Sequence, residues 1–202
     1  MKWNKVFIIL SDVDNEYLVE AADYYKRRYS VPNECCFANK SEKGYNELKC
    51  CILKGSCDFD TKLIIVCNGT KDSKIAMDSF YCNGYEFAHY LKRLGIRSVG
   101  LVAFKCSNSG SFGFLENFIS ACNGLYMNIG WAIGYIGDVS LFFGYEIVNI
   151  KGFWEFGSII DLTSRLCGKL SDSKRIHLVE GNSCVIIPGS RRYGYSSIQK
   201  EK

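Results

Sequence analysis

The chain has 202 residues, 48% of them hydrophobic and 23% charged, which is typical of a soluble globular protein. Its net charge of +4 is too small to indicate nucleic acid as a partner, because the 25 basic residues are interspersed with 21 acidic ones. Because no apolar run approaches the roughly 18 residues of a membrane span, we expect no transmembrane segment. The length favours one domain over residues 1–202.

The N-terminus and the cysteines indicate the compartment. The stretch MKWNKVFIILSDVD contains one apolar run that is too short for the core of a signal peptide. The eleven cysteines include no CxxC pair, and the adjacent pairs at 35–36 and 50–51 lack the spacing of a zinc site. We expect no metal and reduced, mostly buried thiols in a cytoplasmic compartment. A disulfide framework in a secreted protein is the alternative.

Strand and helix signals alternate in the first third of the chain. An apolar stripe predicts a helix over 15–29, capped by Asp12 or Asp14 and ended by Pro32. The other elements predicted here are strands at 5–10, 34–39 and 62–67 and a helix at 43–55, which Gly55 closes.

The middle third continues this alternation. A helix is predicted to begin at Asp78 or Ser79, either of which can act as the N-cap, and to end at Leu94 before Gly95. The elements predicted next are a buried strand at 98–104 and a helix at 112–124 that ends at Asn123-Gly124.

The last third is richer in strands. Gly137-Asp138 marks a turn, and a hairpin is one interpretation of the strands in this region. Gly181-Asn182 separates two runs that predict a C-terminal β-hairpin. The predicted elements are strands at 131–143, 144–150, 175–181 and 183–189 and a last helix at 154–170.

The order of these elements predicts the fold class. Strands that alternate with helices indicate βαβ units, hence a mostly parallel central sheet with helices on both faces. Chemistry in such sheets gathers beyond the carboxyl ends of the strands. Asn68-Gly69 and Cys106 each lie just beyond the end of a predicted buried strand. We therefore expect these residues to form the candidate site.

Three consecutive stretches carry a resemblance to a known family. They are LIIVCNGTKDSKIAM (63–77), the predicted helix DSFYCNGYEFAHYLKRLG (78–95) and IRSVGLVAFKCSNSG (96–110). Their layout resembles that of caspase-like cysteine peptidases, most of all the self-processing protease domains of large bacterial toxins, with clostripain-type peptidases more distant. The resemblance covers about 62–110 closely and the rest in outline, and it implies a caspase-like three-layer sandwich.

The resemblance implies roles for residues at the two strand ends. Cys106 matches the position of the nucleophile, and Asn68, followed by Gly69, occupies the position of the histidine that assists it. A cysteine peptidase needs a group that moves protons, and an amide has no proton to move near neutral pH. His89, within a predicted helix, and His177, within a predicted strand, are interpreted as structural, with an unusual base as the alternative.

The toxin relatives are activated by a highly phosphorylated inositol, which lysines and arginines near a C-terminal hairpin bind. In this chain Lys174 and Arg175 precede the predicted hairpin, and Arg191 and Arg192 follow it. These residues are candidates for an anion site that takes inositol phosphate, and solvated surface is the alternative interpretation. No cofactor is expected to be required.

Three functions follow as hypotheses. The first is a catalytically impaired caspase-like domain, a pseudo-protease that binds a protein or peptide segment, such as a bacterial effector or toxin fragment delivered into a host cell. The second is an active cysteine peptidase that uses Cys106 with His177 or His89 as its base. The third is an unrelated α/β binding domain. The sequence specifies neither the partner nor the oligomeric state.

Overall fold

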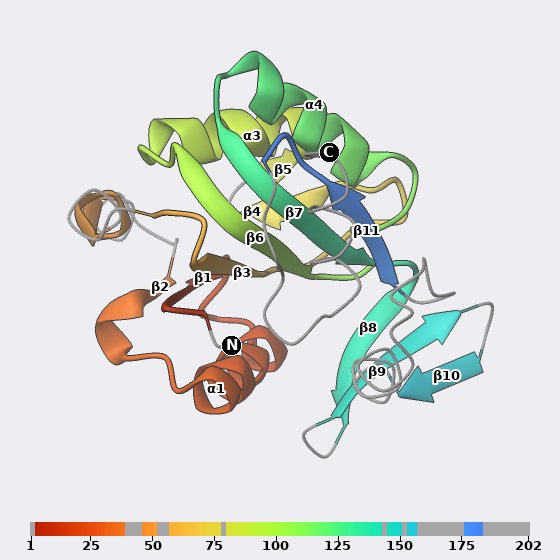
Figure 1. Cartoon of the computed structure of the whole chain (residues 1–202). Helices are drawn as coiled ribbons and strands as arrows, with labels where there is room; N and C mark the ends of the chain where they lie inside the picture. The colour runs from red at the N-terminus through yellow and green to blue at the C-terminus, as the bar shows by residue number, and fades with distance from the viewer. Residues whose placement is uncertain are drawn as a thin grey trace.

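The central feature of the chain is a six-stranded sheet. A computed structural model describes residues 3–38, 46–51, 57–77, 80–142, 145–150, 153–156 and 176–183. Within it the strand order of the sheet is β11-β7-β6-β3-β1-β2 (Figure 1). The strands are β1 (Lys5–Leu10), β2 (Cys36–Ala38), β3 (Thr61–Val66), β6 (Ser98–Lys105), β7 (Asn128–Tyr135) and β11 (Ile176–Glu180).

The direction of the strands fixes one edge of this sheet as the place for a site. Within this sheet the neighbouring strands β2, β1, β3, β6 and β7 run parallel, and β11 is antiparallel to β7. In chain order the parallel strands are arranged as in other doubly wound sheets, and the winding reverses between β1 and β3. Ligands of such sheets bind beyond the carboxyl ends near this reversal, which here means the ends of β1, β3 and β6.

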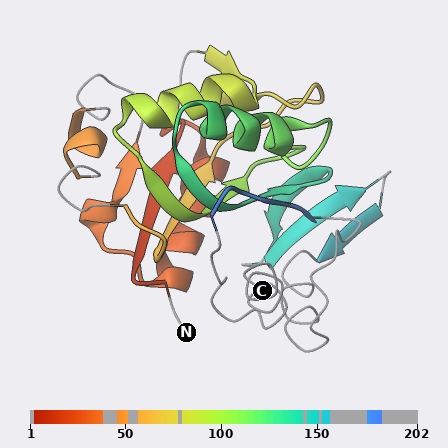
Figure 2. The ribbon, with the colours of Figure 1, turned by 45° about the horizontal axis from the view of Figure 1, so that its top comes forward.

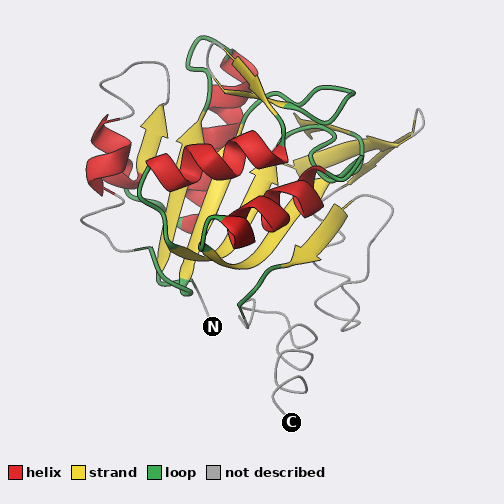
Figure 3. Cartoon of the chain, turned by 90° about the horizontal axis from the view of Figure 1, so that it is seen from above, coloured by secondary structure: helices red, strands yellow, loops and turns green. Residues whose placement is uncertain are grey.

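Helices cover both faces of the sheet (Figures 1 and 3). Helix α1 (Glu16–Tyr29) packs on one face, against apolar side chains of β1 and β3. Helices α3 (Gly84–Arg93) and α4 (Phe114–Gly124) pack on the other face. The helical residues 46–51 add Leu48 to that second core. The predicted fold class, a mostly parallel sheet with helices on both faces, is confirmed.

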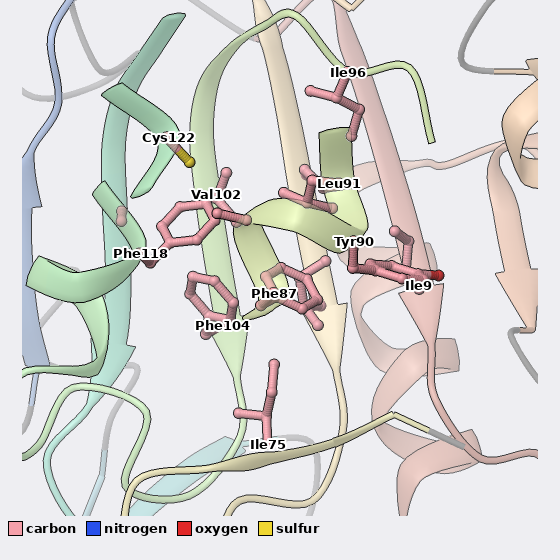
Figure 4. Close-up of a cluster of buried hydrophobic side chains, with 14 of the residues drawn as sticks. Ile9, Ile75, Phe87, Tyr90, Leu91, Ile96, Val102, Phe104, Phe118 and Cys122 are labelled. Atoms are coloured by element: carbon pink, nitrogen blue, oxygen red, sulfur yellow. The ribbon is translucent and has the colours of Figure 1, made fainter. Parts of the chain in front are cut away.

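An aromatic cluster holds α3 and α4 to the sheet (Figure 4). Phe104 of β6 lies at its centre, with ring centroids 5.2 Å from Phe87, 5.1 Å from Phe114 and 5.3 Å from Phe118. All three ring pairs have edge-to-face geometry, which adds about 0.5–1.5 kcal/mol per pair beyond area burial. This cluster fixes the end of β6, and with it the position of Cys106.

The N-cap of α1 differs from the predicted one. Asn15, rather than Asp12 or Asp14, is the N-cap, and its side chain accepts hydrogen bonds from the backbone N–H groups of Tyr17 and Leu18. Asp12 instead accepts from the backbone N–H of Asp14 at 2.9 Å, which forms the turn before the helix. The helix ends at Tyr29, three residues before Pro32.

The segment before α3 corrects the predicted helix start at Asp78 or Ser79. Residues 75–77 and 80–82 form a two-stranded ribbon of β4 (Ile75–Met77) and β5 (Phe80–Cys82). The helix begins at Gly84, because Asn83 and Glu86 form a capping box there. The backbone N–H of Glu86 donates to the Asn83 side chain at 3.0 Å, and the N–H of Asn83 donates to Glu86 at 2.8 Å.

The chain after β7 forms a separate antiparallel sheet of β8 (Asp138–Phe142), β9 (Tyr145–Ile150) and β10 (Phe153–Phe156). This sheet projects beside the β7 and β11 side of the molecule (Figure 2). The hairpin joins β8 to β9, and β7 belongs to the central sheet. The helix predicted at 154–170 is wrong for 154–156, which are strand, and its remainder lies outside the described residues. So does the predicted strand at 183–189 beyond residue 183.

The Asn15 cap predicts the effect of a single substitution. An Asn15→Ala change should lower the free energy of unfolding by about 1 kcal/mol, because two backbone N–H groups lose their acceptor. Glu20→Ala, at an exposed position of the same helix, should change it by less than about 0.5 kcal/mol. Urea denaturation measures both, and equal effects of the two changes would contradict the assignment of the cap.

Candidate functional site

The two predicted strand ends meet through their backbones. Gly69 follows β3 and Ser107 follows β6, and a Cβ atom placed on Gly69 would lie 1.7 Å from the Ser107 carbonyl oxygen. No side chain fits at Gly69 without moving one of the two loops. The glycine of Asn68-Gly69 is therefore required by the close approach of the loops.

Asn68 contributes its backbone to this edge. Its carbonyl oxygen accepts a hydrogen bond from the N–H of Ala76 at 2.8 Å, and Gly69 forms a β-bridge with Ile75. Both contacts attach the strand end to the β4–β5 ribbon. The Asn68 residue is exposed, whereas Cys106 is only 1% exposed.

Cys106 is a core residue whose thiol contacts the thiol of Cys67. Alternation along β3 places Leu63 and Ile65 on the α3 and α4 face, and Cys67 continues that series. The Cys67 and Cys106 thiols are hydrogen-bonded to each other. The side chain that β3 delivers to Cys106 is thus that of Cys67. Cys82 of β5 packs in the same core.

Burial sets the protonation of the neighbouring thiols. It raises the pKa of Cys67 well above the ordinary value of 9.0, and the hydrogen bond with Cys106 adds to the rise. Burial also raises the pKa of Cys82 to about 12, and that of Cys122 on α4 to about 12. Because the thiolate is the nucleophile, buried thiols that stay protonated at neutral pH are unreactive. The nine cysteines in the described ranges are free thiols.

The loop that follows Cys106 uses its polar groups to hold the fold together. The Ser109 hydroxyl donates to the Cys106 carbonyl at 2.8 Å and accepts from the Tyr135 N–H at 3.2 Å. The Ser107 hydroxyl accepts from the Val139 N–H at 2.9 Å. These bonds tie the loop to β7 and β8. They make the loop a structural connection between β6, β7 and β8.

A second anchor joins this loop to the loop after β3. The Ser73 hydroxyl donates to the carbonyl oxygens of Ser111 at 2.9 Å and of Asn108 at 3.3 Å. Ser73, Asn108 and Phe112 have φ angles of 56°, 58° and 52°, in the left-handed region that side chains disfavour. Three such residues cost of order 1–3 kcal/mol each, so the surrounding bonds over-determine the geometry of this edge.

Neither histidine of the chain is paired with Cys106. The Nε2 atom of His177 lies 2.6 Å from the Glu116 carboxylate of α4. Its Cβ would lie 2.9 Å from a Cβ placed on Gly110, so His177 borders the loop that follows Cys106. The His89 ring lies 4.8 Å from the Tyr85 ring on α3. The predicted anion-site residues Lys174, Arg175, Arg191 and Arg192 lie outside the described residues.

The sequence interpretation missed a group of lysine–tyrosine pairs on the opposite face of the sheet. Lys62 of β3 donates to the Tyr29 hydroxyl at 2.7 Å, and Lys105 of β6 donates to the Tyr135 hydroxyl at 2.7 Å. Burial by itself raises the pKa of Tyr29, but the charges of Lys62 and Lys105 outweigh it and lower the pKa. Strand alternation could have identified both lysines, because each occupies the α1 face of its strand.

Comparison of the chain with protein-family models, with curated proteins and with solved structures finds no match. In the part of the chain that the structure describes, no three histidine, cysteine or acidic side chains are grouped to hold a metal ion. No helix within the same ranges has both the length and the apolar character needed to cross a membrane.

The contact of Gly69 with Ser107 predicts a large effect of one methyl group. Gly69→Ala should lower the free energy of unfolding by about 3 kcal/mol or more, because its Cβ overlaps the Ser107 carbonyl. Gly124→Ala is the matched control, since no atom lies within 4 Å of a Cβ at this helical position. It should be neutral or raise stability by about 0.5–1 kcal/mol. A Gly69→Ala protein as stable as the wild type would disprove the close approach.

The buried thiols predict loss of stability at alkaline pH. Cys82 and Cys122 hold their protons to a pKa of about 12 in the folded chain, whereas unfolded thiols ionise near 9.0. Their contribution is complete below about pH 9 and is lost as the pH rises through about 12. Urea denaturation between pH 8 and 11 measures this. Cys122→Ala should lower stability at pH 8 through its cavity but reduce the further loss per pH unit; an unchanged slope would contradict the assignment.

Proposed function

We propose that this chain is a catalytically impaired domain of caspase-like architecture that acts by binding a protein or peptide. The observation that carries the proposal is the burial of Cys106, which is 1% exposed and hydrogen-bonded to Cys67. A nucleophile must reach its substrate and must be activated by a base. A buried thiol whose partner is another thiol meets neither condition.

Two further observations support impairment. Asn68 stands where the resemblance implies a histidine, and an amide cannot relay a proton. The hydroxyls of Ser107 and Ser109 in the loop after Cys106 are used in bonds to β8 and β7, and the Ser111 carbonyl of that loop accepts from the Ser73 hydroxyl of the loop after β3. The mostly parallel sheet with helices on both faces agrees with the three-layer architecture that the resemblance implies.

An active cysteine peptidase is the second candidate, and one observation favours it. His177 borders Gly110 in the loop after Cys106, and Glu116 orients its ring at 2.6 Å. A base held by a carboxylate is the arrangement that activates catalytic nucleophiles, and sites without substrate can be looser than working ones. Opening of the loop would have to bring Cys106 and His177 together.

The finer predictions on setting belong to the same proposal. The partner is a protein or a peptide segment, the compartment is reducing, and delivery into a host cell as an effector fits a toxin-like domain. Capture of inositol phosphate by Lys174, Arg175, Arg191 and Arg192 stays a prediction. Titration with inositol hexakisphosphate while following the melting temperature tests it.

Thiol labelling separates the two candidate functions. With iodoacetamide at pH 7.5, Cys50, which is exposed, should react at least about tenfold faster than Cys106, because burial blocks the access of the reagent to the Cys106 thiol. Mass spectrometry of peptides from the alkylated protein measures both rates, with urea-unfolded protein as the control in which they converge.

The opposite result has a definite form. If a thiol-reactive peptide probe labels Cys106 in the folded protein, and Cys106→Ser and His177→Ala each abolish peptide hydrolysis, then the chain is an enzyme. In that case the proposal of an impaired domain is wrong.

A further inference from the structure

The β4–β5 ribbon has one strand edge that is used and one that is open. On the used side, the N–H of Ala76 donates to the Asn68 carbonyl at 2.8 Å, and the N–H of Thr70 donates to the Lys74 carbonyl at 2.8 Å. The loop after β3 therefore pairs with β4, and β4 pairs with β5. The remaining edge of the ribbon is the outer edge of β5.

The hydrogen-bond pattern determines which groups this outer edge presents. Ala76 is opposite Tyr81 in the ribbon. Because the Ala76 N–H points to Asn68, the Ala76–Tyr81 pair is a non-hydrogen-bonded pair of the antiparallel ladder. The backbone N–H and C=O of Tyr81 consequently point away from β4, and among the described residues they meet no backbone partner.

The side chains around this edge are aromatic and exposed. Tyr81 is 64% exposed, Tyr85 at the start of α3 is 57% exposed, and Phe80 is 42% exposed. Natural sheet edges are commonly protected by lysine, proline or a bulge. The β5 sequence Phe-Tyr-Cys has neither charge nor proline. Figure 3 shows the ribbon near the rim of the molecule.

The ribbon that carries this edge is packed firmly against the core. Ile75 and Met77 are fully buried and Cys82 is 1% exposed, so the inner face of the ribbon belongs to the main core. The capping box that follows fixes Asn83 immediately after β5. An incoming strand would thus meet a preorganised edge, which lowers the entropic cost of binding.

We infer that the outer edge of β5 is a docking site for an extended peptide segment of a partner protein, which adds as a strand beside Tyr81 and contacts the rings of Phe80 and Tyr85. This inference rests on the binding role proposed above and names its partner class. Strand addition satisfies the donor and the acceptor of one residue together through the main chain of the partner. A second copy is disfavoured, because two three-residue edges bury far less than the roughly 1,200 Å² of a stable dimer.

A random decapeptide display library is the probe, selected on the full-length protein under reducing conditions. The tightest peptide is synthesised with single N-methyl groups along its length. Removal of main-chain donors that face Tyr81 should weaken binding about tenfold, whereas N-methylation at alternating positions that face away should leave it unchanged. Amide exchange at Tyr81 should slow on binding.

Protein variants complete the test. Tyr81→Pro removes the backbone N–H donor of the edge and should weaken binding about tenfold. Tyr81→Val keeps that donor, so the peptide should protect the same backbone amides from exchange as in the wild type. Tyr17→Ala, an 84% exposed tyrosine on α1, is the matched control and should have no effect. If Tyr81→Pro unfolds the ribbon, the N-methyl series decides, since it leaves the protein unchanged.

Three results would overturn the inference. They are the absence of any selected peptide, an N-methyl series without alternation, and a dimer in light scattering that Tyr81→Pro dissociates. Selected peptides that protect another surface would overturn the β5 site and leave the binding role intact. Reactivity of Cys106, by contrast, would overturn the impaired function without touching the β5 edge.

Discussion

The contact between the backbones of Gly69 and Ser107 is the constraint on which the carboxyl edge of the sheet depends. It brings the loops after β3 and β6 within van der Waals distance, so no crevice can form between them at that point. The Ser73 hydroxyl then ties the same two loops together from outside. Because both strand ends are fixed, Cys67 and Cys106 are forced to face each other within the core.

This constraint changes the chemical meaning of the cysteine. At an open strand end, a thiol near neutral pH is a candidate nucleophile, and its activity depends on the base beside it. At a closed strand end it behaves as a small apolar side chain that a substrate cannot reach. The amide at Asn68 and the burial of Cys106 therefore both oppose activation of the Cys106 thiol as a nucleophile. An Asn68→His change would supply a base but would not make Cys106 accessible.

The central sheet was predictable because its strands are continuous apolar runs, and α4 was predictable from its apolar stripe and its terminal Asn123-Gly124. The β4–β5 ribbon was not, since three-residue strands are too short to show a period, and the capping box at Asn83 was overlooked in favour of earlier caps. The sequence placed Asn68 and Cys106 at the correct strand ends. It did not show that alternation along β3 directs Cys67 toward Cys106, although a strict count of strand positions from Leu63 contains that information.

The ribbon inserted between β3 and α3 connects the closed edge with the exposed one. Its inner face supplies Ile75, Met77 and Cys82 to the core around Cys106, and its outer edge presents Tyr81 to solvent. The same short segment thus contributes to the core that buries Cys106 and presents an open strand edge on its other side. The proposed loss of catalysis and the proposed peptide-binding edge both follow from this single packing arrangement.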